Sequence, residues 1–442
     1  MPTPFMGMRG TGEFTTNQVP TSWAQYIMYE YPNGSAPLFA MQSMYKQETV
    51  SSYQHTWFKK TMPTQSGACA LYIDTGLTTL YVYLTHQATR GIVGGVLYAK
   101  VTEALAGEFN VNATVLLRDT DEETVEVGAI VTAIHLNGAS SWIAVKLQEA
   151  DDNHATIATY NLATVDLIMR SSNAQPDGSV APSAIAYDPD EMYNYVQNYR
   201  NTLDMTLEAK AEMLRTGDAY LEAKRECTEL HSIDIEKSAF WGRRYNGVGD
   251  NGQPQRTTEG IIPMVTREVP TNVLNFRTSA DVRFSGKTWL QAGPKFLSVY
   301  LTQLFRYMSE TECIAFCGDG ALLGIQELAE TYGQVNLTTE SSSYGLNITK
   351  WRVPSGIINL KTHPLFSHEE THRYLMVLGH PKNGKFCPKV GGGENFRTKF
   401  ETDMQIPGQH SKLDGYTTKG MWKWYFPNQW MVLWGVGQDN VN

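Results

Sequence analysis

The chain has 442 residues, 42% hydrophobic and 18% charged, which suits two or three globular domains and excludes a disordered or collagen-like protein. Its formal net charge of −9 argues against general binding to phosphate backbones, which requires a basic surface. The N-terminus shows no apolar segment of a secretory signal, and the apolar runs are too short to cross a bilayer. Five widely spaced cysteines predict buried free thiols in a reducing cytoplasm.

The first part of the chain, residues 1 to about 60, shows no sustained helical periodicity and is predicted to be an extended arm. Residues from about 90 to 170 are predicted to form a small all-β module. Asn137-Gly138 within it is a hairpin signal, because both residues tolerate positive φ in a two-residue turn. A polar linker is expected at 171–182. The candidate strands of the module are Val96–Val101, Val111–Arg118, Thr124–Ile134, Trp142–Gln148 and Val165–Met169.

The next segment carries conflicting signals. Asp188-Pro189 could cap a helix, with proline at the first helical position. Tyrosines at alternate positions from Tyr193 to Tyr199 instead favour one face of a strand. We therefore predict a strand over Tyr193–Asp204.

Three helices are predicted in the second half of the chain, at Asp218 to about Arg243, Trp289–Met308 and Ala321–Tyr332. For the first, Asp218 is the expected N-cap, and Ala223, Cys227 and Leu230 are expected to form the buried stripe. Arg225 and Glu229 are spaced for a pair one turn apart. A charge at Leu230 is then expected to prevent folding, because an unpaired buried carboxylate is very costly.

His368-Glu369-Glu370-Thr371-His372 matches the H-E-x-x-H pattern of zinc peptidases. This pattern works only on a helix, where both imidazoles share one face and the glutamate lies beside the metal-bound water. The residues after His372 have strand-like composition, and the continuation typical of metzincins is missing. Glu394 is at a tolerable distance for a third ligand, but it follows a run of glycines. A polar turn between two strands is favoured over a zinc site.

Gly318-Asp319-Gly320 through Gly324 lies between a strand-like stretch, Cys313–Cys317, and a predicted helix. This is the context of a dinucleotide-binding loop, but the third glycine is one place late and no regular β-α-β alternation surrounds it. A tight structural turn is favoured. Cys313 and Cys317 are expected to be buried, because no histidine or basic residue nearby in the sequence suggests an activated thiol.

The aromatic stretches Met421–Phe426 and Trp430–Trp434 alternate with a period of two residues. They are predicted to be core strands instead of a binding surface. No serine elbow, paired carboxylates or phosphate-binding loop is present. The residues alone therefore predict no catalytic, cofactor-binding or metal-binding residues.

The ordered set of these stretches resembles the major capsid proteins of tailed bacteriophages, in particular the SU-ten-like group with the Hong Kong 97-type capsid fold. The resemblance covers nearly the whole chain. The blocks that carry it are Pro37-Leu38-Phe39 with Trp57, Asn194–Arg200, Arg215–Asp218, Glu229–Lys237 through Gly242–Arg244, Thr257–Ile261, Cys313–Gly320, Tyr344-Gly345 leading to His363-Pro364, and the closing aromatic strands.

The resemblance implies an α+β fold of Hong Kong 97 type, with an N-terminal arm, an extended loop carrying a small β-barrel-like insertion, a spine helix, and peripheral and axial domains. The segments implied are 1–45 for the arm, 46–204 for the extended loop with its insertion at about 90–170, 205–285 for the spine helix and peripheral domain, 286–415 for the axial domain, and 416–442 for strands returning to the peripheral domain.

The implied function is structural. Such a chain self-assembles into hexamers and pentamers of an icosahedral head that encloses double-stranded DNA without sequence-specific binding. No enzyme activity, cofactor or membrane is implied, whereas portal, scaffolding or decoration proteins are possible partners. The protein is expected in the virion after assembly in the bacterial cytoplasm. Two alternatives stay open, a zinc metallopeptidase using His368, Glu369 and His372, and an encapsulin-type compartment that packages enzymes.

Overall fold

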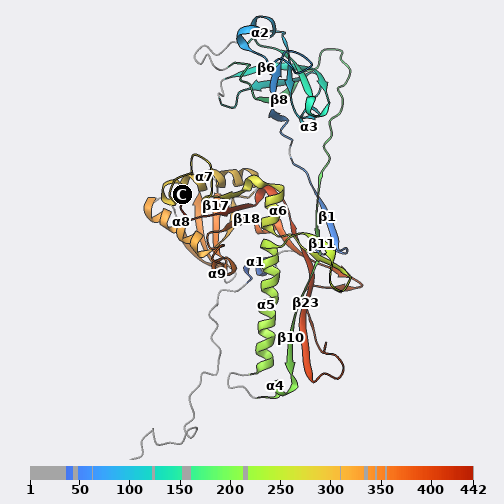
Figure 1. The fold of residues 1–442 in the computed structure, drawn as a ribbon, viewed down its shortest axis with the longest axis vertical. Coiled ribbons are helices and arrows are strands. Elements are labelled where there is room, and N and C mark those ends of the chain that lie inside the picture. Colours follow the sequence, from blue (N-terminus) through green and yellow to red (C-terminus); the bar gives the residue numbers. More distant parts are fainter. Residues whose placement is uncertain are drawn as a thin grey trace, which may run out of the picture. The chain divides into compact units, whose positions relative to one another are not determined.

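The computed structural model describes residues 36–42, 48–61, 63–121, 125–151, 161–212, 218–308, 310–332, 337–343, 346–353 and 356–441. These residues fall into two compact units (Figure 1). One unit comprises residues 58–190, and the other contains the chain before and after it. Of the predicted arm at 1–45, the structure describes residues 36–42, which include helix α1 (Pro37–Gln42). No described helix is both long and apolar enough to cross a membrane.

The unit of residues 58–190 is built on a seven-stranded antiparallel sheet in the order β2-β8-β5-β6-β7-β4-β3. β2 and β3 stand at opposite ends of this order but are joined by Cys69 alone, so the sheet curls until its two edges meet. The elements are β2 Ser66–Ala68, β3 Ala70–Tyr72, α2 Tyr83–Arg90, β4 Val96–Lys100, α3 Glu103–Ala106, β5 Ala113–Arg118, β6 Glu126–His135, β7 Trp142–Leu147 and β8 Leu167–Asn173.

The predicted strands of this module are confirmed, with ends shifted by a few residues. These strands form because buried apolar residues alternate with more exposed ones. On β5, Ala113, Val115 and Leu117 are buried and the residues between them are half-exposed. The compact unit is longer at both ends than the predicted 90–170.

The hairpin at Asn137-Gly138 is present, but its loop spans the residues between β6 and β7, and only Gly138 has positive φ. The expected two-residue turn is therefore wrong.

The other unit contains a mixed seven-stranded sheet in the order β13-β24-β18-β14-β17-β16-β15. The pairs β13–β24 and β14–β17 are parallel, and the other neighbours are antiparallel. Its strands are β13 Val273–Asn275, β14 Glu312–Cys317, β15 Leu337–Ser343, β16 Leu346–Val353, β17 Gly356–Thr362, β18 Met376–Gly379 and β24 Met431–Trp434.

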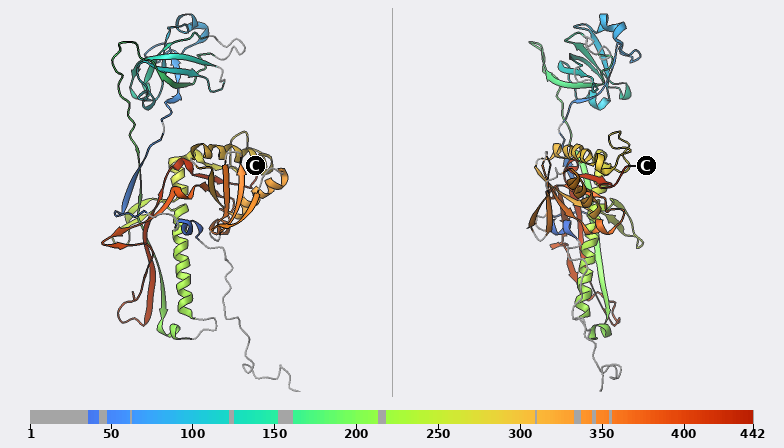
Figure 2. Two further views of the ribbon diagram at one scale, coloured as in Figure 1. Left: turned by 180° about the vertical axis from the view of Figure 1, so that it is seen from behind. Right: turned by 90° about the vertical axis from the view of Figure 1, so that its left-hand side faces the viewer.

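Both faces of this sheet are covered. Helices α7 (Trp289–Tyr307) and α8 (Asp319–Tyr332) pack on one face, which presents Ala315, Leu360 and Leu433 (Figure 2). Side chains of α5 (Ala219–Trp241), α6 (Ile261–Glu268) and α9 (Pro364–His368) join the cluster on the other face, with Phe316 and Val377. The predicted helices at 289–308 and 321–332 are confirmed, the second starting two residues earlier.

A second sheet of this unit has β23 (Ser411–Trp424) at its centre, with β10 (Gln197–Thr206) on one side. On its other side β23 pairs with β19 (Gly384–Pro388) and β22 (Lys399–Glu401). Helix α5 packs against β10 and β23 (Figure 1). The strand predicted over Tyr193–Asp204 is confirmed as β9 (Asp190–Tyr195) followed by β10, and the aromatic strands near the end of the chain are confirmed as β23 and β24.

Short elements complete this unit. β1 pairs with β9, β11 with β12, and β20 with β21. Their bounds, with those of the two remaining short helices, are α1 Pro37–Gln42, β1 Gln54–Lys59, α4 Leu207–Ala211, β11 Tyr245–Val248, β12 Pro254–Thr257, β20 Val390–Gly391 and β21 Glu394–Asn395.

Helix α5 has the predicted N-cap but a different buried face. The Asp218 carboxylate accepts a hydrogen bond from the Tyr220 backbone N–H at 2.8 Å. Leu230, however, is 55% exposed, so the prediction that it lies in the buried stripe is wrong. Cys227 is buried as predicted, and the buried stripe continues through His231 and Ile235, each four residues further on. The helix buries polar side chains, and a search for apolar periodicity therefore selects the wrong phase.

Candidate functional site

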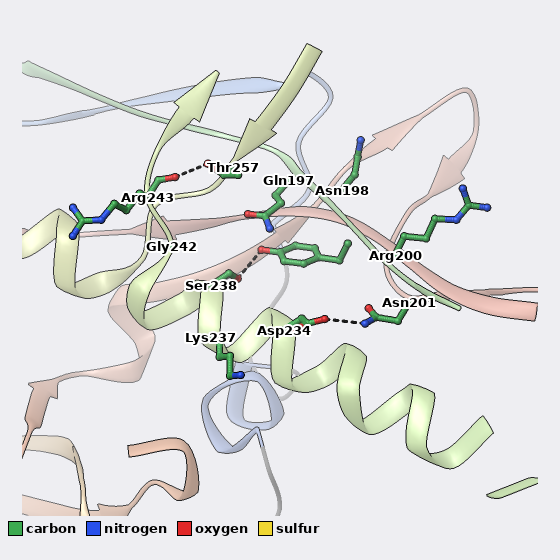
Figure 3. Close-up of a pocket in the computed structure, with 11 residues that line it drawn as sticks. Gln197, Asn198, Arg200, Asn201, Asp234, Lys237, Ser238, Gly242, Arg243 and Thr257 are labelled. Carbon is green, nitrogen blue, oxygen red and sulfur yellow. Dashed lines mark hydrogen bonds between the residues drawn. The ribbon is translucent and has the colours of Figure 1, made fainter. Parts of the chain in front are cut away.

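A polar hollow of about 560 Å³ lies between β10 and the C-terminal part of α5 (Figure 3). On its floor, the Tyr199 and Ser238 hydroxyl oxygens are 2.6 Å apart, and Asn201 donates to the Asp234 carboxylate at 2.8 Å. Its lining residues are Gln197, Asn198, Tyr199, Arg200, Asn201, Asp234, Lys237, Ser238, Gly242, Arg243 and Thr257.

The positive side chains of the hollow do not converge. Figure 3 shows Arg200 and Arg243 at opposite ends, each extended away from the centre, with Lys237 on a third side. Arg200 also lies 3.7 Å from the Glu401 carboxylate. The centre of the hollow is formed by uncharged hydroxyl and amide groups beside Asp234. This arrangement suits contact with a polypeptide surface better than capture of one small anion.

Behind the hollow, the Tyr199–Ser238 pair continues into the core. Ser238 donates to the Ile235 carbonyl oxygen at 2.6 Å and accepts from the Trp422 indole N–H at 3.1 Å. Burial raises the pKa of Tyr199, so its phenol stays neutral. These contacts join β10, α5 and β23 through polar groups whose hydrogen bonds are satisfied, as buried polar groups require.

Asn194, on β9, is the centre of a second buried group. Its amide N–H donates to the Trp422 carbonyl oxygen at 2.7 Å and to the Thr258 hydroxyl at 3.0 Å. Its amide oxygen accepts from the backbone N–H of Glu259 and of Tyr195. One side chain therefore connects β9, β23 and the residues that precede α6.

His231, on α5, links the helix to both strands beneath it. Its two ring nitrogens are each 2.7 Å from a partner oxygen, one on Asn201 of β10 and one on Thr418 of β23. Burial lowers the pKa of His231, although Asp234 partly opposes this. The imidazole is therefore held neutral near pH 7 and acts as a fixed hydrogen-bonding bridge.

The chain near α1 is anchored on α5 by Glu236. This carboxylate is fully buried and accepts from the backbone N–H groups of Leu38 at 2.8 Å and Phe39 at 2.7 Å. The Nε2 atom of His363, also fully buried, lies 2.8 Å from the same carboxylate. His363 stacks on Phe366, with ring centroids 4.7 Å apart. A buried carboxylate is tolerated here because it has three partners.

A second carboxylate, Glu48, anchors the chain further along. It lies 2.9 Å from the Lys385 ammonium and 3.0 Å from that of Lys423, and it accepts from the Tyr425 hydroxyl. Burial by itself raises the pKa of Glu48, but hydrogen bonds from Tyr425, Lys385 and Lys423 outweigh this and lower the pKa to about 2.

The H-E-x-x-H residues do not lie on one helix. α9 ends at His368, residues 370–374 form a turn, and β18 follows. The predicted polar turn is therefore present before a strand, but the expectation that it also follows a strand is wrong, because α9 precedes it. His372 lies between Trp241 and Trp434, with ring centroids 5.0 and 5.7 Å away. Within the described part of the chain, no three His, Cys, Asp or Glu side chains are arranged to hold a metal ion, and Glu394 is in β21.

The predicted tight turn is limited to Gly318, which alone separates β14 from α8, and Gly324 lies within that helix. A Cβ atom at Gly318 would lie 2.3 Å from the Arg373 carbonyl oxygen, and one at Gly324 would lie 2.4 Å from the Cα of Gly437. Cys313 and Cys317 are buried, and burial raises the pKa of each thiol to about 12. These thiols are therefore unreactive near neutral pH.

Sequence reasoning did not identify Asn194, His231, Glu236 or His363 as important. Their partners are distant in sequence, 127 residues in the case of Glu236 and His363, so no local pattern marks them. All four nevertheless fall in the blocks that carry the family resemblance. The sequence blocks that resemble the family were therefore the available signal, because they contain the buried polar groups that hold α5, β10, β23 and α1 together.

The family model and the curated relative indicate the same family. A family model described as SU10 major capsid protein matches residues 1–412. The major capsid protein of Pseudomonas phage PaMx41 is 28% identical over 347 residues, which cover 78% of this chain and 73% of that protein.

Among solved structures, one from Microbacterium phage Oxtober96 is 8% identical, with a TM-score of 0.41 and coverage of 94% of this chain and 95% of that one. One from Mycobacterium phage Patience is also 8% identical, with a TM-score of 0.39 and coverage of 62% and 78%.

The mixture of helices and strands confirms the predicted α+β fold class. The family match extends over most of the chain, and the related phage protein supports the same function. The chain therefore belongs to the SU10 major capsid protein family and is a structural capsid protein of a tailed bacteriophage.

Proposed function

We propose that the chain assembles into hexameric and pentameric capsomers of an icosahedral head that encloses the double-stranded DNA of the phage. The observation that carries this proposal is the family match over residues 1–412. The net charge of −9 supports an enclosure that surrounds DNA without binding its phosphates tightly. On this proposal, assembly takes place in the bacterial cytoplasm and the protein ends in the virion.

Each segment then has a role in the shell. Residues 1–45 are the arm, 46–204 the extended loop, 205–285 the spine and peripheral part, 286–415 the axial part, and 416–442 the returning strands. Two observations support this division. α5 is a 23-residue helix that fits the role of a spine. His231 of α5 contacts Thr418 of β23 at 2.7 Å, which brings the end of the chain beside the 205–285 segment.

The proposal assigns no catalytic, metal-binding or cofactor-binding residue to the chain. Portal, scaffolding or decoration proteins are its further partners, and contact with DNA is independent of base sequence. The position of Glu369 in a turn, instead of on the helix that a zinc peptidase needs, supports a role without catalysis.

Electron microscopy of the purified protein, with assay of nuclease-protected DNA from infected cells, tests the proposal. Closed shells that contain DNA are expected. Shells that hold protein cargo and no DNA would instead support the encapsulin-type alternative, and a stable monomer at all concentrations would refute assembly.

Elemental analysis tests the absence of zinc. The double variant His368→Ala with Glu369→Ala removes one candidate ligand and the candidate base, and it leaves His372 in its contacts with tryptophan. We expect no stoichiometric zinc in either protein and equal assembly. One zinc per wild-type chain, lost in the double variant, would revive the peptidase alternative.

A further inference from the structure

Strand β10 has one free edge. Over all ten of its residues it pairs with β23, from Gln197 opposite Gly420 to Thr206 opposite Ser411, without a bulge. Among the described strands, none pairs with its other side. A strand with one unpaired side presents backbone N–H and C=O groups that are ready to bind another strand.

The register identifies which residues face this free edge. In an antiparallel ladder, alternate residues direct both backbone groups toward the partner strand, and the residues between them direct both away. The Leu207 N–H donates to the His410 carbonyl oxygen, so the odd-numbered residues of β10 face β23. On β23, Lys419 and Leu413, opposite Asn198 and Asp204, bond to segments on the other side. Both observations show that the odd-numbered residues of β10 bond to β23 and that the even-numbered residues face the free edge.

Asn198, Arg200, Thr202 and Asp204 therefore direct their backbone groups to the free edge, and these four side chains are exposed. Residues of the opposite parity, such as Tyr199 and Leu203, are buried beside α5. His231 of α5 contacts both β10 and β23, so the helix packs on one face of the two strands.

The free edge lacks most of the features that prevent edge-to-edge pairing in soluble proteins, and its two charged residues, Arg200 and Asp204, have opposite signs. β10 contains no proline, no lysine and no bulge. The stretch from Asn198 to Asp204 extends for roughly 20 Å, which is the length of an ordinary paired strand. An unprotected edge of this length in a self-assembling protein is expected to be occupied in the assembly.

We infer that the free edge of β10 pairs antiparallel with the same edge of a second copy, centred on Thr202. The charge pattern selects this occupant. Arg200 and Asp204 are two residues on either side of Thr202, so the two-fold arrangement places Arg200 of each copy opposite Asp204 of the other. Opposite charges and paired threonines across strands are both favourable. This inference rests on the proposed self-assembly.

The polar hollow supports this arrangement. It is lined by residues 197–201 at the free edge and by Asp234, Lys237 and Ser238 of α5. In the paired state, each hollow lies at the junction of two copies, where hydroxyl, amide and charged groups can bond across the interface.

Cross-linking tests the register. In the inferred pairing, residue 202 of one copy is directly opposite residue 202 of the other, within the range for a disulfide. Thr202→Cys is therefore expected to form covalent dimers in assembled particles under mild oxidation. Arg200→Cys, equally exposed but not opposite itself, is the matched control and is expected to stay monomeric on a non-reducing gel. Wild-type protein measures the background from the native cysteines.

A backbone test is independent of cysteine chemistry. Thr202→Pro removes the N–H at the free edge without removing a bond to β23, whereas Thr202→Ala keeps the N–H. We expect the proline variant to fold and to assemble about tenfold less well, as follows from loss of backbone hydrogen bonds across an interface. In wild type, the amide of Thr202 should exchange about tenfold more slowly in shells than in dissociated protein, while that of Leu203 is protected in both.

The outcomes separate this inference from the proposed function. If wild-type protein forms no shells, self-assembly itself fails. If shells form but the Thr202 amide exchanges equally fast in both states, or the Thr202→Cys variant gives no dimers, the β10 pairing is refuted. Impaired assembly of Thr202→Pro without covalent dimers of Thr202→Cys would show that a different segment occupies the edge, which also refutes the self-pairing.

Discussion

In the unit of residues 58–190, the strands bury only apolar side chains and glycine, and the buried carboxylates Asp119 and Asp151 lie outside the strands. The unit that contains α5 instead buries charged and polar groups where its helix and strands meet. Val115, Leu117 and Val145 are typical of the first core. Glu236, His363 and Asn194 are fully or nearly fully buried in the second. The same chain therefore uses two ways of holding strands together.

This difference determines how strictly each core requires its own side chains. Apolar cores tolerate exchange among similar side chains if volume and pattern are kept. Buried polar groups tolerate very little, because each unsatisfied donor or acceptor carries a large cost. We expect the second unit to have one sharply defined arrangement of α1, α5, β10 and β23, which suits the part of a capsid protein that must fit its neighbours.

The largest expected effect comes from Glu236→Ala. This change leaves His363 and the backbone N–H groups of Leu38 and Phe39 without a buried acceptor. We expect a loss of about 3–5 kcal/mol in the free energy of unfolding, measured by urea denaturation. Glu226→Ala, an exposed change on the same helix, is the control and should cost about 0.5 kcal/mol or less. Equal stability of the two variants would contradict the polar core.

Leu117→Ala addresses the apolar unit. Leu117 is fully buried on β5, and its truncation is expected to cost about 2–5 kcal/mol through lost burial and a residual cavity. Leu84→Ala, at a residue that is 93% exposed in α2, is the control. Hydrogen exchange resolved by residue should show faster opening of the 58–190 strands and unchanged protection of α5. Faster exchange in both units would mean that they unfold together.

The Glu48 anchor predicts a dependence on pH that is specific to the unit with α5. The folded pKa of Glu48 is about 2, below its ordinary value of 4.5, so the stabilisation is present above pH 4.5 and is lost as the pH falls toward 2. Glu48→Gln should cost about 1 kcal/mol or less at pH 7, since the group is partly solvated. The difference between variant and wild type should shrink at pH 3. A constant difference across this range would exclude the ionised anchor.

Leu230→Asp has the smallest expected effect. Because Leu230 is exposed on α5, the change should alter stability by about 0.5 kcal/mol or less, in contrast to the expectation from apolar periodicity alone. Ile235→Asp, in the buried stripe, is the matched comparison and should prevent soluble expression. Comparable solubility of both variants would show that the phase of α5 is wrong.

The apolar unit was also the more predictable from sequence. Its strands follow the two-residue alternation directly, so all five candidate strands in 90–170 are confirmed. The sequence predicts helix α5 because Asp218 is a good N-cap and the helical pattern is long. It predicts the wrong buried face, because the true buried face carries the polar residues His231 and Glu236. The prediction of a two-residue hairpin loop was wrong because Asn137 does not adopt the positive φ that such a turn would need.

The candidate site could not be derived from local patterns. Its contacts join residues such as Asn194 and Trp422, which are 228 positions apart, and no spacing rule predicts them. The family resemblance included most of these residues without indicating what they do. Conversely, the most familiar motif, at His368–His372, proved to be a turn, because the preceding helix begins at Pro364 and ends at His368.

β1 and β9, which run side by side, are where the chain leaves one unit and returns to it. A segment whose two ends lie at neighbouring positions of a domain behaves as a domain insertion. It can be lengthened, exchanged or removed with little change to the domain that carries it. Evolution can then vary this segment between relatives while the remaining fold is kept. The same property makes its loops natural places to display foreign peptides on a particle.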